Sequence, residues 1–467
     1  MNRRRFLAAG LAPALVTTRA LAQPRRPNVV LVMTDDHGAW ALGSSGCKDI
    51  HTPNLDRLAA GGARFTQAYA ATPVCSPSRM TYLTGRLPST HGVQDWLRPP
   101  DSYGPASRRW LEGHPTFTEM LAGAGYKLGM CGKWHMGHDD QPQAGFTYWA
   151  TVPGGGGTYR NPVMVRSGTT VETQGYKTDL VADAALDFLD QSHGGPFFLY
   201  LPFYAPHTPY DFQPEPYRAP YADSEFSCFP NTKPHDWTNA TTRRLHGVQG
   251  NKRAYSSLVS GVDANVGRIE KKLEQLGVRD NTLIIFTADQ GWNAGHHGFW
   301  GKGNGTWPFN MYEESIRVPM IWNHPGRIRA GQVLNPMVSS YDFFPAILDY
   351  LDVAAPPDAK RPGRSYAGFL TGDRPRWGNT LFFEYSYVRA IRSGKWKFIE
   401  RTQDWPSEFY DLDKDPDEEN DLFHSPGHRG RREQLRVELR EFFDRLGAPP
   451  LEKWLSTTRQ ELTRYNR

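Results

Sequence analysis

The segment Cys75-Ser76-Pro77-Ser78-Arg79 joins a cysteine to an arginine four residues later. A helix pattern entered through Pro77 follows, so the cysteine is expected beside helix-start amides, which favour bound anions. A cysteine taken alone is more often a small buried hydrophobic residue, and that remains the alternative for Cys75 by itself. The complete pentapeptide, with Thr84-Gly85-Arg86 after it, reverses this preference.

Two pairs of oxygen-donor residues each follow an apolar run. Asp35 and Asp36 end one run, and Asp289 and Gln290 end another. Adjacent aspartates are usually helix caps or solvated turns, which is the alternative interpretation. If both pairs lie at one sheet edge, three carboxylates and an amide carbonyl meet there. Such hard oxygen donors suit Ca²⁺ or Mg²⁺ rather than Zn²⁺.

Two lysines and two histidines also follow apolar runs or stand in short motifs. Lys133 and Lys302 are candidate anion-binding groups, although single lysines are more often surface cations. His135 and His207 are candidates for proton transfer, because an unperturbed histidine titrates near working pH. Prolines close to His207 hold it on a stiff turn. Three further histidines are secondary candidates for supporting or purely structural roles: His37, His296 and His297.

Four apolar runs are expected to position these residues. They are predicted strands at residues 28–33, 126–131, 196–203 and 282–287. Each leads into candidate residues, and ligands of open α/β sheets bind at the carboxyl ends of strands. Apolar residues spaced three and four apart over 258–276 predict a helix that ends at Gly277. The alternation indicates an α/β core whose strand ends converge on one cleft.

The pattern changes near residue 370. Short aromatic or β-branched runs between 380 and 399 predict antiparallel hairpins, and an apolar face over 435–446 predicts a helix. A glycine run, Gly154–Gly157, is interpreted as a flexible loop, since no phosphate-binding signature follows it. The predicted units are a signal peptide at 1–22, a catalytic α/β domain at 23–372 and an α+β subdomain at 373–467.

The composition is that of a globular protein. A chain of 467 residues with 39% hydrophobic and 22% charged residues excludes long disorder, collagen and coiled coils. Much of the net charge of +5 lies in the first 22 residues, so nothing indicates nucleic-acid binding. Four cysteines are too few for a disulfide scaffold, and we expect no disulfide on which the fold depends.

The N-terminus carries a targeting pattern. A twin arginine precedes an apolar run at 6–16, and Ala20-Leu21-Ala22 is typical of a cleavage site. This pattern favours export by the twin-arginine translocase to the periplasm or beyond. A short anchor or basic helix is the alternative, but the run is too short to span a bilayer. We expect no stable membrane insertion of the mature protein.

Cys-x-Pro-x-Arg followed by Thr-Gly-Arg resembles the modification signature of type I sulfatases, in which a formylglycine-generating enzyme oxidises the cysteine. Other segments resemble sulfatase segments in the same order: 27–38, 52–57, 132–137, 205–209, 289–291, 301–303, 312–319 and 409–412. The resemblance implies an arylsulfatase-like member of the alkaline phosphatase superfamily. It also implies a large mixed sheet flanked by helices, a smaller C-terminal antiparallel sheet with a helix, and one bound calcium.

The resemblance also implies residue roles. One calcium ion, or Mg²⁺ in its place, would be held by modified Cys75 and by the two oxygen-donor pairs: Asp35, Asp36, Asp289 and Gln290. Gln290 departs from the Asn or His common at that family position. Lys133 and Lys302 would clamp the sulfate, and Arg79 would hold the aldehyde hydrate. His207 would protonate the leaving alcohol, and His135 would take a proton from the second hydroxyl.

The substrate is predicted to be a sulfated sugar, because a glycine-rich, polar and aromatic segment at 295–304 suits a loop that lines a cleft. Six tryptophans near the motifs are candidates for stacking on a sugar, with core packing as the alternative: Trp40, Trp96, Trp134, Trp292, Trp300 and Trp307. The competing functions are a phosphodiester or phosphonate monoester hydrolase of the same superfamily and a non-catalytic carbohydrate-binding protein. A two-zinc phosphatase is disfavoured by Asp289-Gln290.

Overall fold

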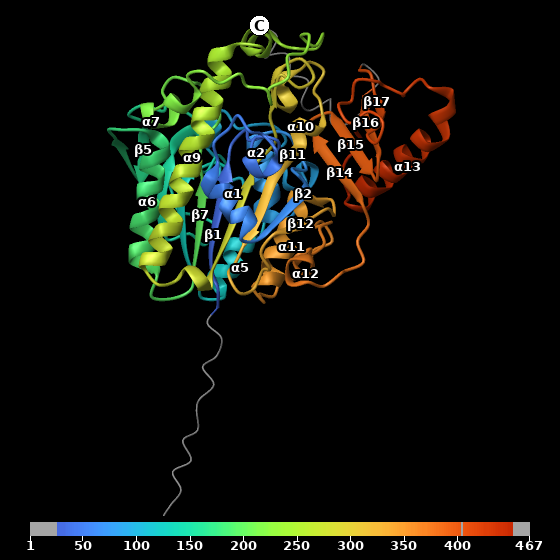
Figure 1. Ribbon diagram of the computed structural model, residues 1–467. Helices are drawn as coiled ribbons and strands as arrows, with labels where there is room; N and C mark the ends of the chain where they lie inside the picture. The colour runs from blue at the N-terminus through green and yellow to red at the C-terminus, as the bar shows by residue number, and fades with distance from the viewer. Residues whose placement is uncertain (1–25, 403–404, 452–467) are drawn as a thin grey trace, which may run out of the picture.

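The computed structural model describes residues 26–402 and 405–451. The predicted signal peptide at 1–22 and residues 452–467 of the predicted C-terminal subdomain lie outside this part of the chain. A large mixed sheet lies between two layers of helices, and a smaller antiparallel sheet with its own helix lies beside it (Figure 1). The fold class predicted from the sequence is confirmed.

The large sheet has 11 strands within the described residues. They are β1 (Asn28–Thr34), β2 (Ala63–Tyr69), β3 (Lys127–Lys133), β4 (Tyr148–Val152), β5 (Val163–Arg166), β6 (Thr169–Glu172), β7 (Phe197–Pro202), β8 (Thr282–Ala288), β11 (Arg317–Asn323), β12 (Gln332–Leu334) and β13 (Val338–Ser339). The order is β12-β2-β11-β8-β1-β7-β3-β4-β5-β6, with β13 paired to β2. The central strands β8, β1, β7, β3 and β4 are parallel, so their carboxyl ends meet at one edge.

Helices cover both faces because the central strands are apolar on both sides. Along β1, odd-numbered residues from Val29 to Met33 pack in one core and even-numbered residues pack in the other. One face is covered by α1 (Pro53–Ala60), α6 (Lys177–Ser192) and α9 (Gln249–Gln275). The opposite face is covered by α2 (Cys75–Thr84), α5 (Phe117–Gly123), α11 (Ser340–Tyr350) and α12 (Ala367–Thr371).

Shorter elements lie in the connections between these strands and helices. They are α3 (Pro88–His91), α4 (Pro99–Ser102), α7 (Glu215–Arg218), α8 (Ala240–Leu245), α10 (Glu313–Ile316), β9 (Asn293–Ala294) and β10 (Trp300–Gly301). The predicted strands at 28–33, 126–131, 196–203 and 282–287 correspond to β1, β3, β7 and β8, and the predicted helix is part of α9. No helix among the described residues is long and apolar enough to cross a membrane.

The smaller sheet has the order β14 (Thr380–Tyr385), β15 (Val388–Ser393), β16 (Trp396–Arg401) and β17 (Glu408–Asp411), all antiparallel. Helix α13 (Arg429–Arg445) packs on it through Leu435 and Leu439, as the hairpin and helix patterns predicted. The same core includes Val74, the residue before Cys75. The small sheet therefore supports the start of α2.

Cysteine pairing needs a correction. A disulfide joins Cys47 to Cys228, with Cα atoms 5.6 Å apart and a sequence separation of 181 residues. The sequence analysis did not predict it, because a cysteine count carries no information on distances in the fold. The bond ties the loop after β1 to the long connection between β7 and α9. Cys131 in β3 keeps a free buried thiol.

Candidate active site

Backbone hydrogen bonds tie the carboxyl ends of β1, β7 and β8 together. Thr34 pairs with Ala288 at the end of the β1–β8 register. The Asp289 amide donates to the Thr34 carbonyl at 3.0 Å, and the Asp35 amide donates to the Ala205 carbonyl at 3.3 Å. The segments after the three strands therefore lie side by side, and their side chains converge as the strand-end argument predicted.

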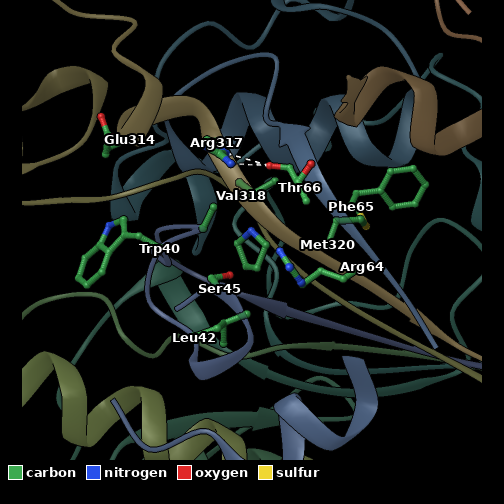
Figure 2. Close-up of a pocket in the computed structure, with 12 residues that line it drawn as sticks. Trp40, Leu42, Ser45, Arg64, Phe65, Thr66, Glu314, Arg317, Val318 and Met320 are labelled. Carbon is green, nitrogen blue, oxygen red and sulfur yellow. Dashed lines mark hydrogen bonds between the residues drawn. The ribbon is translucent and has the colours of Figure 1, made fainter. Parts of the chain in front are cut away.

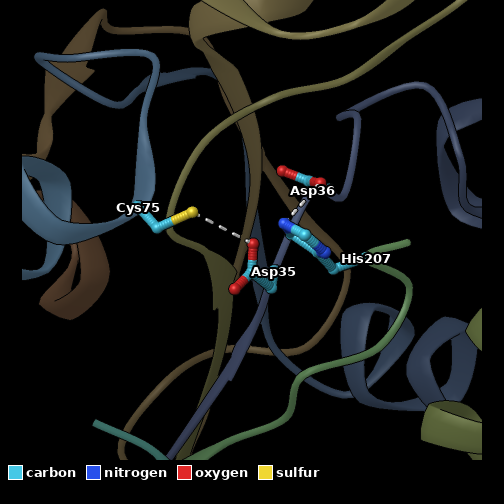
Figure 3. A group of neighbouring side chains, drawn as sticks. All are labelled: Asp35, Asp36, Cys75 and His207. Atoms are coloured by element: carbon cyan, nitrogen blue, oxygen red, sulfur yellow. Dashed lines mark hydrogen bonds and ion pairs between the residues drawn. The ribbon is translucent and has the colours of Figure 1, made fainter. Parts of the chain in front are cut away.

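Cys75 is the first residue of α2 and is buried, with its thiol beside Asp35 (Figure 3). Its Sγ lies 3.5 Å from Asp35 Oδ1 and 2.9 Å from Lys302 Nζ. Burial and Asp35 oppose ionisation of the thiol, but Lys133 and Lys302 outweigh them and hold its pKa well below its ordinary value. The surroundings therefore favour negative charge on the side chain at position 75.

Three buried carboxylates crowd around this thiol. Burial disfavours ionisation of Asp35, but the surrounding cations, Lys133 foremost, hold its pKa well below the usual range. Burial raises the pKa of Asp36. Burial, reinforced by the negative charge of Asp35, also raises the pKa of Asp289. Like charges are thus held together away from water, which is costly unless cations neutralise them.

Arg79 links the two strand ends that carry the carboxylates. Its Nε and Nη2 lie 2.9 and 2.8 Å from Asp289 Oδ2, and Nη2 lies 3.3 Å from Asp35 Oδ2. Its Nη1 donates to the Lys133 carbonyl at 2.6 Å. Because four residues make about one helical turn, Arg79 shares the face of α2 that presents Cys75.

The two lysines predicted to bind sulfate reach the same place from different segments. Lys133 ends β3, and its Nζ lies 2.5 Å from Asp35 Oδ2. Lys302 follows β10, and its Nζ lies 2.6 Å from Asp36 Oδ1. Both are buried. They place two ammonium groups beside the position 75 side chain, where an anionic substrate group would be bound.

His135 is buried, and Nε2 carries the proton of its neutral ring. That atom lies 2.7 Å from the Leu97 carbonyl, which accepts but cannot donate, so the neutral ring keeps its lone pair on Nδ1. Burial and the nearby Lys133 charge lower the pKa of His135 to about 4, while the Cys75 thiol acts in the opposite direction. At neutral pH this ring is therefore a proton acceptor.

His207 has the opposite character. Its Nε2 lies 3.6 Å from Asp36 Oδ2, its Nδ1 contacts the Thr208 carbonyl, and its ring packs on Tyr204 with centroids 4.8 Å apart. Burial lowers the pKa of His207, but Asp36 and Asp35 outweigh burial and raise it. This ring holds a proton that it can give up. The site thus carries one basic and one acidic histidine.

The oxygen-donor set fits a hard divalent cation. Ligand atoms of Asp35, Asp36, Cys75 and His207 all lie within 4.8 Å of one another. Asp36 Oδ2 and Gln290 Oε1 are buried without a hydrogen-bond partner among the described residues. Gln290 Nε2 lies 2.6 Å from Asp36 Oδ1, and half a turn of the amide puts the carbonyl oxygen in its place. The predicted metal residues therefore fit a calcium ion.

A cavity of about 340 Å³ opens onto Cys75 and its neighbours. Its outer wall includes Trp96, Trp292, Tyr204, Thr242 and the backbone of Gly154–Gly156. Tyr204 and Thr242 were not predicted from the sequence, and the glycines were interpreted only as a flexible loop. The four consecutive glycines were the available signal, because only glycine lets the chain pass this close to a site.

Several secondary candidates lie elsewhere. His37 donates through Nε2 to the Ala41 carbonyl at 3.1 Å, and burial lowers its pKa to about 4. His296 and His297 line a different cavity, beside the C-terminal sheet. Among the tryptophans, Trp96 and Trp292 line the cavity above Cys75. Four pack elsewhere: Trp40, Trp134, Trp300 and Trp307.

A separate hollow of about 210 Å³ lies between the loop after β1 and strands β2 and β11 (Figure 2). Trp40, Arg64 and Arg317 are among its lining residues. Arg317 donates through Nε to the Thr66 carbonyl at 3.0 Å. Burial and the like charge of Arg317 lower the pKa of Arg64. None of the predicted catalytic or metal-binding residues lines this hollow, so it is distinct from the candidate active site.

Comparison with known families matches residues 27–353 to the Sulfatase family and residues 295–445 to the family described as N-sulphoglucosamine sulphohydrolase, C-terminal. The N-acetylglucosamine-6-O-sulfatase of Bacteroides thetaiotaomicron is 28% identical, covering 93% of this chain and 89% of that protein. Human arylsulfatase A is 31% identical, covering 89% of this chain and 85% of that protein.

Solved structures agree with these matches. A structure in complex with its substrate D-glucosamine-2-N,6-O-disulfate superposes with a TM-score of 0.76 at 26% identity, covering 91% of this chain and 98% of that one. The phosphonate monoester hydrolase of Agrobacterium radiobacter shares the fold, with a TM-score of 0.68 at 22% identity over 90% of this chain and 96% of that one. The chain belongs to the sulfatase family of the alkaline phosphatase superfamily. It is an enzyme that hydrolyses sulfate esters.

Proposed function

We propose that this protein is an exported, calcium-dependent sulfatase that desulfates a sugar through a formylglycine made from Cys75. The observation that carries the proposal is the position of Cys75. It lies at a helix start between two buried ammonium groups and a carboxylate cluster with unpaired oxygens. The twin-arginine pattern at 1–22 supports export, and folding before translocation would allow a formylglycine-generating enzyme to act in the cytoplasm.

The modified residue and the metal would supply complementary chemistry. Formylglycine, once hydrated, carries two hydroxyls on one carbon, one for attack on sulfur and one whose deprotonation expels sulfate. The Cys75 sulfur marks the place of these oxygens. A calcium ion held by the modified residue, Asp35, Asp36, Asp289 and Gln290 would add positive charge opposite the sulfate oxygens.

Side chains of the protein bind the sulfate and transfer the protons. Lys133 and Lys302 bind sulfate oxygens and draw negative charge toward position 75. His207, whose pKa is raised, donates its proton to the leaving alcohol oxygen. His135, whose pKa is lowered to about 4, accepts a proton at Nδ1 from the position 75 hydroxyl. Arg79 keeps Asp35 and Asp289 in register by bonding both.

The cavity supports a sugar as the alcohol part of the ester. Its volume of about 340 Å³ is near the lower end of ligand pockets, which suits a single ring. Trp96 and Trp292 offer flat apolar faces, and Asn304 lines the same wall beside Lys302. The names of the Bacteroides relative and of the substrate complex, both of glucosamine sulfates, support the same class.

A substrate panel tests this function and its competitors. Sulfated mono- and oligosaccharides, an aryl sulfate, an aryl phosphodiester and an aryl phosphonate are assayed side by side with wild type and Cys75→Ala. We expect a sulfated sugar to be the best substrate and Cys75→Ala to lose about 10⁴-fold or more in kcat. Preference for the phosphodiester or phosphonate would identify the related hydrolase. Sugar binding without any turnover would identify a non-catalytic protein.

A further inference from the structure

The glycine run Gly154–Gly157 is fixed against a catalytic histidine. Gly155 has a φ of +68°, and a Cβ at this position would lie 2.2 Å from Cδ2 of the His135 ring. The ring is buried and cannot move aside. The backbone at Gly155 therefore packs directly on the imidazole, and no other residue type fits there.

Lys177 holds this loop from behind. It is the first residue of α6 and is 1% exposed. Its Nζ donates to the carbonyls of Gly156 and Gly157 at 3.1 and 2.7 Å. No carboxylate forms an ion pair with it in the described part of the chain. Burying an ammonium group whose acceptors are two peptide carbonyls costs folding free energy, which points to a functional reason for its position.

The same ammonium group also contacts the support of the second histidine. Lys177 Nζ lies 4.0 Å from the ring centre of Tyr204, a cation–π contact, and 5.3 Å from that of Tyr159. The Tyr204 ring in turn packs on His207 with centroids 4.8 Å apart. Lys177 therefore contacts both the glycine loop that packs on His135 and the Tyr204 ring that packs on His207.

We propose that Lys177 is a positioning residue that aligns both histidines with residue 75, by holding Gly154–Gly157 against His135 and Tyr204 against His207. The inference rests on the sulfatase mechanism proposed above. Lys177 lines neither the cavity nor the carboxylate cluster, so its effect passes through the glycine loop and Tyr204. A residue of this kind alters the alignment of the reacting groups more than the binding of substrate.

The charge of Lys177 adds a pH dependence to this support. Burial, opposed by Asp211 and Asp35 and reinforced by Lys133, lowers the pKa of Lys177 to about 7. A lysine whose pKa is lowered is charged below that value and neutral above it. The two carbonyls are therefore held most firmly below about pH 7, and the loop is held less firmly as pH rises.

Hydrogen–deuterium exchange tests the mechanical half without relying on activity. In Lys177→Met, amides of the peptide that contains Gly154–Gly157 should exchange at least about tenfold faster than in wild type. A peptide from β1 serves as the internal reference and should be unchanged. Equal exchange of the glycine peptide in both proteins would overturn the proposal, whatever the enzyme's substrate proves to be.

Kinetics test the catalytic half. Lys177→Met should lower kcat about 10- to 100-fold with KM within about threefold, and Lys177→Arg should restore part of the loss. Gly155→Ala should lower kcat similarly. Gly194→Ala, just beyond the end of α6, is its control, because a Cβ there meets nothing within 4 Å and the residue does not line the cavity over Cys75, and it should stay near wild type. A rise in KM at constant kcat, or equal effects of the two alanines, would contradict the proposal.

Thermal unfolding of every variant checks that the fold is kept. If Lys177→Met does not fold, the comparison of Gly155→Ala with Gly194→Ala decides the question. Wild type is assayed in parallel on the sulfate panel. Absence of sulfate ester turnover in wild type would refute the proposed function, whereas normal wild-type turnover with an unaffected Lys177→Met would refute only the role of Lys177.

Discussion

The loop at 295–305 reaches two clusters of histidine and carboxylate that differ in how their charges are neutralised. Through Lys302 it enters the cluster around Cys75. Through His297 it enters a second cluster with Glu314 and Glu418, beside the C-terminal sheet. His297 Nε2 lies 2.7 Å from Glu314 Oε2 there. Glu418 Oε1 lies 2.7 Å from a buried lysine, Lys397 Nζ, so the second cluster is closed by ion pairs.

The pKa directions are mixed in both clusters, since burial also raises the pKa of Glu418 to about 7, and, although burial opposes ionisation of Asp35, cations hold its pKa well below the usual range. Burial opposes ionisation of Glu314, but His297 outweighs it and lowers the Glu314 pKa to about 2. In the first cluster burial raises the pKa of both Asp36 and Asp289, and Asp36 Oδ2 has no hydrogen-bond partner among the described residues. The second cluster has a cation beside each of its two carboxylates, so we assign it a structural role. The first one holds crowded charge that a metal and an anionic substrate can relieve, which is typical of functional sites.

The largest expected contrast comes from removing one carboxylate from each cluster. Asp36→Asn should lower kcat/KM by about 10²-fold or more, because it removes a metal-binding oxygen. In metal-free protein its Tm should change little, because the relief of a buried negative charge is offset by the loss of the Lys302 partner at 2.6 Å. Glu418→Gln should keep kcat within about fivefold but lower stability by about 1 kcal/mol, because Lys397 loses one of its two buried carboxylate partners and keeps Glu313 at 3.1 Å. Assays and calorimetry that show Asp36→Asn to be the less stable variant would reverse the comparison.

Metal removal should lower the activity that depends on the first cluster and leave the second cluster unchanged. Chelation should lower kcat by about 10²-fold or more, and calcium, or less well magnesium, should restore it. Asp289→Ala should weaken both metal affinity and turnover, whereas Gln290→Asn should be mild because the amide carbonyl is kept. Titration of metal-free protein with each cation, followed by activity, gives the test. Restoration by zinc alone would exclude the oxygen-donor assignment.

The rate should depend on pH through the two histidines and, on the alkaline side, also through Lys177. His135, with a pKa lowered to about 4, becomes a proton acceptor as pH rises through that value. His207 has a pKa raised above the ordinary histidine value of about 6.5, so it remains a proton donor to a higher pH than a free histidine does. The profile of kcat should therefore be bell-shaped. His207→Gln should change the alkaline limb, leaving the contribution of Lys177, and His135→Asn should lose the acidic limb. Either variant with an unchanged profile would contradict its assignment.

The smallest expected effect concerns the His297–Glu314 pair. His297→Gln should lower stability by about 1 kcal/mol and change kcat by less than about threefold. His297 has a raised pKa, so its contribution is full below about pH 6.5 and is lost as pH rises through the folded value. On the acid side it is lost as Glu314 becomes protonated. Denaturant melts of both proteins at about pH 6 and about pH 9 measure this difference.

Local sequence patterns together with the resemblance to sulfatase motifs predicted which residues meet at the strand ends. Each of these residues follows an apolar strand or stands in a short ordered motif, so Cys75, Lys133 and Asp289 could be placed before any contact was known. The parallel strands β1, β3, β7 and β8 then bring their carboxyl ends to one edge. The hairpins of the C-terminal sheet were predictable for the same reason, because period-two patterns are local.

Contacts between distant, unpatterned residues were not predictable. Lys177 lies 20 residues from Gly157 and begins an ordinary amphipathic helix, and nothing in its neighbourhood marks it as buried. The Leu97 carbonyl that sets the His135 tautomer is a backbone atom, which no residue type reveals. The Cys47–Cys228 bond joins loops 181 residues apart. Each of these depends on the tertiary fold alone.

The mass of the tryptic peptide that carries Cys75 tests most directly whether this sulfatase works through formylglycine. Protein purified from its native host is digested, and wild type is compared with Cys75→Ala. We expect the wild-type peptide to have lost the thiol sulfur and two hydrogens and gained one oxygen, with sulfate ester turnover in proportion to the converted fraction. An unmodified cysteine in fully active enzyme would contradict the proposed mechanism.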